Sequence, residues 1–166
     1  MRIYTAATFS EQLRIRSHKE TLIQMGHTVL STWLEEAVRP EGITESQFEH
    51  KMAMKDLQEV AACDCMILDV ASPSKTAGKM VEYGFALAKH KLIYVVGTPP
   101  AHAIFLSLAD LHFNTWNELF EYFKSQHKTE KAFVDQLDSK YLIDGTKPGS
   151  WIPIPVGNIA NGGNPF

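Results

Sequence analysis

The order of hydrophobic and polar positions along the chain predicts alternating strands and helices. Two nearly continuous apolar runs of strand length, CMILDVA at 65–71 and KLIYVVG at 91–97, are typical of parallel strands covered on both faces. Further short apolar runs occur at 2–8, 27–34 and 111–113. The segments between these runs carry apolar residues near helical spacing, at 11–26, 47–64, 78–91 and 115–126.

This alternation indicates one α/β domain over residues 1–150. We expect a doubly wound, flavodoxin/Rossmann-like parallel sheet of about five strands with helices on both faces. Residues 151–166 contain prolines and glycines that prevent regular helix, yet also several large apolar side chains. They are expected to form an extended C-terminal arm that packs on its own domain or a neighbouring subunit, or closes a site.

Composition narrows the possible partners. Sixteen Lys plus Arg against nineteen Asp plus Glu give a net charge of -3, which argues against nucleic-acid binding. No apolar run approaches the roughly 18 residues of a membrane span, and the N-terminus does not resemble a signal peptide, so a cytoplasmic protein with no membrane partner is expected. Cys63 and Cys65 lack further Cys or His residues at ligand spacing, and we expect neither a metal nor another cofactor.

Glu82 is the candidate for chemistry, because it is the one carboxylate in the mostly apolar segment 78–91. In a doubly wound sheet, ligands bind beyond the carboxyl ends of the strands, and Glu82 follows the third strand closely. With Thr76 as N-cap, Glu82 falls in the second helical turn, and Gly78 lies four residues earlier on the same face, where it leaves room for a flat ligand.

A carboxylate in this position can attack the anomeric carbon of a nucleoside and form a glycosyl ester. The departing base then needs a proton, for which Asp56 in the preceding helix is the candidate. The loops after the strands supply further substrate-binding candidates. They are Phe9, Trp33, Asp69, Ser74, Lys75 and Thr76.

Four stretches of the chain, IYTAATFS, STWL, KDLQEVAACDCMILDV and GKMVEYGFALAKHKLIYVVG, resemble the nucleoside 2-deoxyribosyltransferase family. The resemblance extends to its relatives, the deoxynucleoside 5'-monophosphate N-glycosidases, and covers about residues 1–115. It implies that Glu82 is the nucleophile, that Tyr4 holds it through its hydroxyl, and that Asp56 lies near sugar or base. It also implies a homo-oligomer, dimer or higher, in which Ser107 or His102 reaches a neighbour's sugar.

The loop at 72–78 departs from many transferases of the family, which carry an aspartate six residues before the nucleophile. Here that position is Thr76, and SPSKTAG is instead similar to the Pro-Ser loop of the monophosphate glycosidases. Ser74, Lys75 and Thr76 can cradle a phosphate, and Arg14 or Arg16 can add a second cationic contact. Phe9 and Trp33 can stack on a base.

The sequence thus predicts an enzyme that cleaves the N-glycosidic bond of a 2'-deoxynucleoside or its 5'-monophosphate and passes the sugar to another base or to water. Structural alternatives remain open for each site residue; Glu82, for example, can be a surface residue paired with Lys79 or Lys89. At the level of the whole protein, the alternatives are a non-catalytic nucleotide sensor and a flavodoxin-like signalling domain with Asp69 as phosphate acceptor.

Overall fold

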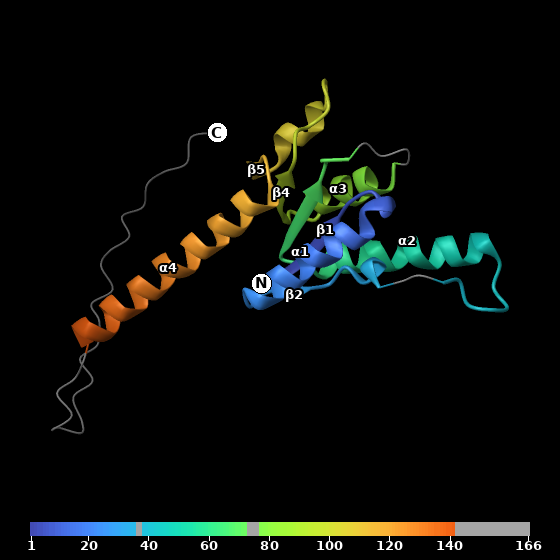
Figure 1. The fold of residues 1–166 in the computed structure, drawn as a ribbon. Helices are drawn as coiled ribbons and strands as arrows, with labels where there is room; N and C mark the ends of the chain where they lie inside the picture. The colour runs from blue at the N-terminus through green and yellow to red at the C-terminus, as the bar shows by residue number, and fades with distance from the viewer. Residues whose placement is uncertain (36–37, 73–76, 142–166) are drawn as a thin grey trace, which may run out of the picture. The chain divides into compact units, whose positions relative to one another are not determined.

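The computed structural model describes residues 1–35, 38–72 and 77–141, which form a parallel sheet flanked by helices (Figure 1). The five strands lie in the order β2-β1-β3-β4-β5. The strands are β1 Arg2–Ala6, β2 Thr28–Val29, β3 Cys65–Asp69, β4 Leu92–Val96 and β5 Leu111–Phe113. The α-helices are α1 Gln12–Gln24, α2 Glu45–Ala62, α3 Gly78–Ala88 and α4 Trp116–Tyr141, and the 3-10 helices are η1 Phe9–Glu11, η2 Thr32–Leu34 and η3 Ile104–Leu108.

Helices cover both faces of the sheet. Thr5, Ile67 and Tyr94 are in register across β1, β3 and β4 and therefore point to one face. On that face the Tyr94 ring contacts aromatic rings of α4. Tyr4 is one residue out of phase and interacts with side chains of α2 and α3 on the opposite face. This arrangement confirms the predicted doubly wound fold.

Strand β2 is much shorter than the apolar run 27–34 suggested. Pairing with β1 stops at Val29. Beyond it, the Thr5 backbone N–H donates to Ser31 Oγ at 2.6 Å, and the Trp33 indole N–H donates to the Thr5 carbonyl at 2.8 Å. Side chains thus satisfy the β1 backbone in place of a strand ladder, and residues Thr32–Leu34 turn into η2.

Helix α4 is longer than the expected segment 115–126, because no glycine or proline interrupts the chain before Gly145. The chain divides into a compact unit, Met1–Lys128, and a second unit, Thr129–Phe166. The second unit is described only as far as Tyr141, so the predicted arm at 151–166 and the boundary at 150 lie outside the described residues. Nowhere in the described part of the chain is there a helix with the length and apolar character of a membrane span.

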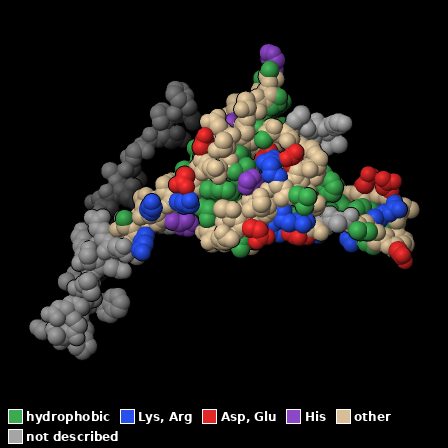
Figure 2. Space-filling view, in the orientation of Figure 1, with side chains coloured by type: hydrophobic (Ala, Val, Ile, Leu, Met, Phe, Trp, Pro, Cys, Tyr) green, Lys and Arg blue, Asp and Glu red, His purple; other side chains and the backbone are tan. Residues whose placement is uncertain are grey.

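The carboxyl ends of β1 and β3 are the topological switch point of the sheet, where doubly wound folds commonly bind ligands in a crevice. The chain moves from β1 outward to β2 and then returns to β3 on the other side of β1, so the strand order reverses at this point. The residues that follow these two strands, and the first turns of α1 and α3, surround this end of the sheet. Figure 2 shows acidic and basic side chains interspersed over the viewed face of the molecule.

Candidate active site

Glu82 lies in the second turn of α3, as the sequence predicted, and its side chain is largely buried. The N-cap position is Ala77, which makes no side-chain cap, and not Thr76, which lies outside the described residues. Neither lysine considered as an ion-pair partner neutralises Glu82. Lys89 instead lies over the ring of Phe85, at 5.4 Å from its centroid.

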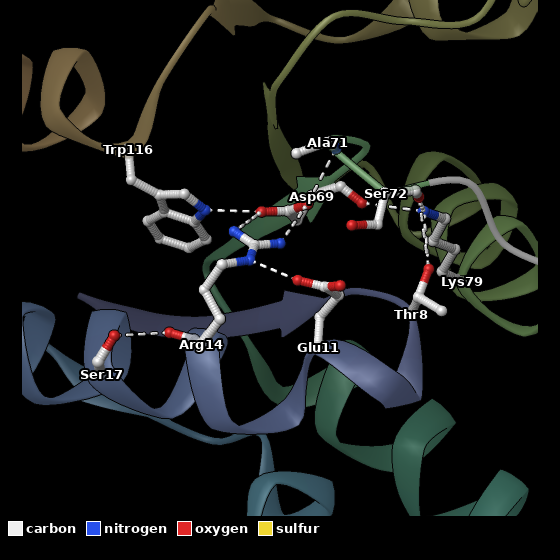
Figure 3. A network of polar contacts seen from close by, with 9 residues as sticks. All are labelled: Thr8, Glu11, Arg14, Ser17, Asp69, Ala71, Ser72, Lys79 and Trp116. Carbon is white, nitrogen blue, oxygen red and sulfur yellow. Dashed lines mark hydrogen bonds and ion pairs between the residues drawn. The ribbon is translucent and has the colours of Figure 1, made fainter.

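Lys79 belongs to a polar network with Thr8, Asp69 and Ser72 (Figure 3). Its ammonium group donates to the carbonyl oxygens of Asp69 and Ser72, each at 3.1 Å, and contacts Thr8 Oγ1 at 3.4 Å. Across the described residues, no ion pair involves the Glu82 carboxylate. Glu82 therefore lacks a cationic partner within the described chain.

Anionic groups and a buried phenol surround Glu82. Burial raises the pKa of Glu82 most, and the charges of Asp56 and Glu59 raise it further, whereas the Tyr4 hydroxyl lowers it; the result is a pKa of about 7. Burial, followed by the charges of Glu82 and Asp56, also raises the pKa of Tyr4. The contact between Tyr4 and Glu82 is looser than a regular hydrogen bond, because the buried Tyr4 hydroxyl has no partner of full hydrogen-bond geometry in the described chain. Glu82 can therefore gain or lose a proton near neutral pH.

A pocket of about 390 Å³ between α2 and α3 brings Glu82 and Asp56 together with Gly78. An added Cβ at Gly78 meets no atom within 4 Å, so the absence of a side chain there leaves open space near Glu82. One wall is apolar, and the polar lining consists of carboxylates. The lining residues are Phe48, Glu49, Met52, Ala53, Asp56, Leu57, Gly78, Val81 and Glu82.

Asp69 lies in a separate polar network at the crevice (Figure 3). It is 2% exposed, and its two oxygens accept from the Arg14 guanidinium at 2.9 and 3.1 Å, from the Trp116 indole N–H at 2.7 Å and from the Ala71 backbone N–H at 3.0 Å. Arg14 also pairs with Glu11 at 2.6 Å. Both oxygens of Asp69 are thus engaged within the protein, which leaves it unsuited to accept a phosphoryl group, as the signalling alternative would require.

The sequence of this chain matches a known protein family. A family model described as nucleoside 2-deoxyribosyltransferase matches residues 3–137, most of the chain. The chain belongs to the nucleoside 2-deoxyribosyltransferase family. This confirms the resemblance seen in the sequence. No significant match was found among curated proteins.

Solved structures with similar folds include a 2-deoxyribosyltransferase from Bacillus psychrosaccharolyticus, at TM-score 0.62 and 17% identity, covering 72% of this chain and 90% of that one. A conserved protein from Enterococcus faecalis V583 gives TM-score 0.59 and 18% identity, covering 76% and 98%. The CMP N-glycosidase BcmB from Clostridium botulinum gives 0.49 and 20%, covering 75% and 98%. The first two likenesses support the fold of the family.

Among the remaining substrate-binding candidates that the structure describes, Phe9, Trp33 and Ser107 do not line the pocket. Phe9 is 66% exposed, whereas Trp33 is 7% exposed, and their rings lie 6.4 Å apart between centroids. Ser107 is exposed on η3, and its hydroxyl donates to the Ile104 carbonyl at 2.7 Å. Ser74, Lys75 and Thr76 lie outside the described residues. The substrate-binding roles of all these residues remain predictions for this member of the family.

Sequence reasoning missed the apolar wall of the pocket and the carboxylate of Glu59. Phe48, Met52, Asp56 and Glu59 are spaced by three or four positions along α2, which places them on neighbouring turns of one helix side. This spacing can be seen in the sequence. The orientation that brings this side of α2 against Glu82 of α3 cannot be predicted from it.

The two arginines suggested for a phosphate already make contacts within the protein. Arg14 holds Asp69 and Glu11, as described above, and Arg16 donates to the Leu34 carbonyl and approaches Glu35 at 3.7 Å. Neither arginine lines the pocket that contains Glu82.

Proposed function

We propose that this protein cleaves the N-glycosidic bond of a 2'-deoxynucleoside or deoxynucleoside 5'-monophosphate with Glu82 as nucleophile. The observation that carries the proposal is a largely buried carboxylate that has no cation beside it in the described chain, lines a pocket and faces Tyr4 and Asp56. Membership in the nucleoside 2-deoxyribosyltransferase family supports this chemistry. The carboxylate and its neighbours supply the functional groups required.

In the first step, an oxygen of ionised Glu82 attacks C1' of the sugar. The new C–O bond forms as the C1'–N bond breaks, and the bonding electrons leave with the base, which takes up a proton. In the second step, a nitrogen of another base or a water oxygen attacks C1', loses its proton, and releases Glu82 as a carboxylate. Transfer and hydrolysis share the glycosyl ester and differ only in the acceptor.

Tyr4 and Asp56 have supporting roles in this proposal. The Tyr4 hydroxyl faces Glu82 from β1 and favours its ionised form, as the lowering of the Glu82 pKa by Tyr4 indicates. Asp56 shares the pocket with Glu82 and is the proposed proton donor to the base or contact to the sugar. The apolar wall formed by Phe48, Met52 and Val81 suits the flat face of a base.

Base release from defined substrates tests the proposal. We expect the wild-type protein to liberate free base from at least one deoxynucleoside or its 5'-monophosphate, and a second free base in the mixture to yield a new nucleoside if transfer occurs; chromatography measures both. Glu82→Ala is expected to lose this activity by orders of magnitude while remaining folded, and Glu20→Gln on α1 serves as the control. Binding without turnover, with only a modest affinity change in Glu82→Ala, would favour the sensor alternative.

We also propose that the protein self-associates as a dimer or larger homo-oligomer. Three large apolar side chains on η3, Ile104, Phe105 and Leu108, are between 59% and 70% exposed beside Ser107. Exposed apolar groups gathered on one short helix are typical of an interface. Light scattering that gave a monomer at micromolar concentration would contradict this proposal and a Ser107 contact across subunits.

A further inference from the structure

Glu59 connects two parts of the structure that the proposed reaction needs. It lies on α2 one turn after Asp56, and its carboxylate accepts from the Thr32 backbone N–H at 3.0 Å and from the Thr32 hydroxyl at 2.5 Å. Both oxygens thus bind one residue at the start of η2. A bidentate contact of this kind fixes the position of η2 relative to α2.

The neighbours of Thr32 in turn hold the strand that carries Tyr4. Ser31 Oγ accepts from the Thr5 N–H at 2.6 Å and lies 3.0 Å from the Thr5 hydroxyl, and the Trp33 indole donates to the Thr5 carbonyl at 2.8 Å. Thr5 directly follows Tyr4 in β1. A chain of contacts therefore runs from Glu59 through η2 to the strand position beside the phenol.

Glu59 also acts on the site through its charge, since it interacts with both Tyr4 and Glu82. The titratable groups that face Glu82 are Tyr4 from β1 and Asp56 and Glu59 from α2. Glu49, also from α2, lines the same pocket. Lys79 and Lys89 of α3 are engaged elsewhere, as described above.

We propose that Glu59 is a positioning residue of the active site, which through its hydrogen bonds to Thr32 holds η2 and the strand that carries Tyr4 in place beside Glu82. The inference rests on the proposed function for its catalytic meaning. The hydrogen bonds of Glu59 and its charge can be separated by mutation. Glu59→Gln removes the charge and keeps an oxygen acceptor for Thr32, whereas Glu59→Ala removes both.

The test is an NMR titration of the Glu82 carboxyl in ¹³C-labelled protein, with the signal assigned by its loss in Glu82→Gln. We expect Glu82 to titrate at lower pH in Glu59→Gln than in the wild type, and at the wild-type pH in the control Glu20→Gln. Hydrogen exchange of the Thr5 and Thr32 amides should remain slow in Glu59→Gln. It should accelerate at least tenfold in Glu59→Ala.

An unchanged titration of Glu82 in Glu59→Gln would overturn the link between Glu59 and Glu82, and wild-type amide protection in Glu59→Ala would overturn the positioning role. Neither measurement requires turnover, so the result is readable even if the protein releases no base. If it does release base, the acidic limb of the pH–rate profile should move to lower pH in Glu59→Gln. A role confined to folding would change stability and leave that limb in place.

Discussion

The replacement Glu82→Gln should stabilise the protein at alkaline pH while it abolishes the proposed reaction. Gln has nearly the size of protonated Glu but cannot ionise. The Glu82 carboxylate is largely buried beside Asp56 and Glu59, so its ionised form is unfavourable in the folded state. Active sites commonly retain such unfavourable charges at the expense of stability.

The magnitude follows from the pKa of Glu82, which rises from 4.5 to about 7 on folding. Because the folded state binds this proton more tightly, its contribution to stability is fully present below pH 4.5 and is lost as pH rises through about 7. At about 1.4 kcal/mol per pH unit, the full loss is about 3 kcal/mol. Glu82→Gln does not incur it, so its advantage over the wild type should grow from about 1 kcal/mol at pH 5 to about 3 kcal/mol at pH 8.

Urea unfolding of both proteins at pH 5 and pH 8 measures this difference, provided that the slope of the transition is the same for each. Glu20→Gln, which removes an exposed carboxylate from α1, controls for the general effect of charge removal. An advantage of equal size at both pH values would refute the reasoning. So would a variant less stable than the wild type at pH 8, since that result would mean that a cation stabilises ionised Glu82.

Three further predictions concern glycines and the crevice network. Gly78→Ala should change stability by no more than about 1 kcal/mol and yet slow base release, because its methyl group enters the pocket; Gly84→Ala, on the same helix with equally open space, should keep the rate. Gly97→Ala should destabilise by more than about 2 kcal/mol in thermal unfolding, because its φ is +103° and the new Cβ would lie 2.7 Å from a backbone nitrogen of the β3 loop. Asp69→Ala should cost about 3–5 kcal/mol in urea unfolding by stranding a half-buried guanidinium and an indole N–H, whereas Asp64→Ala, which breaks an exposed ion pair, should have a far smaller effect.

The sequence predicted the fold well where hydrophobic burial decides the structure. The runs that became β3 and β4 are buried on both faces, and continuous apolar residues reveal this directly. The prediction of a strand over 27–34 was too long for a different reason. Ser31 and Trp33 end the pairing through hydrogen bonds of their side chains to Thr5, and the pattern of apolar residues contains no sign of such bonds.

The candidate site could be predicted only in part. An acidic residue after a strand gives the same sequence pattern whether its side chain contacts a ligand or other groups of the protein. Asp69 ends β3 and Glu82 lies in the second turn of the helix that follows, yet Asp69 is surrounded by donors and Glu82 by acids. Whether Asp56 lies near Glu82 depends on the orientation of α2, and helical spacing does not give that orientation. The pocket that it shares with Glu82 required the packing of two helices.

The separation of charges around α3 explains how Glu82 avoids an ion pair. Lys79 precedes it by three residues, a spacing at which helical side chains commonly pair. Two backbone carbonyls and the hydroxyl of Thr8 hold the Lys79 ammonium on the crevice side instead, and Asp69 draws Arg14 to that side as well. Within the described chain, the network in Figure 3 thus binds Lys79 and Arg14, and the polar side chains that line the pocket between α2 and α3 are carboxylates. A nucleophilic Glu82 needs this arrangement, because an ammonium group beside it would occupy the oxygen that must reach the sugar.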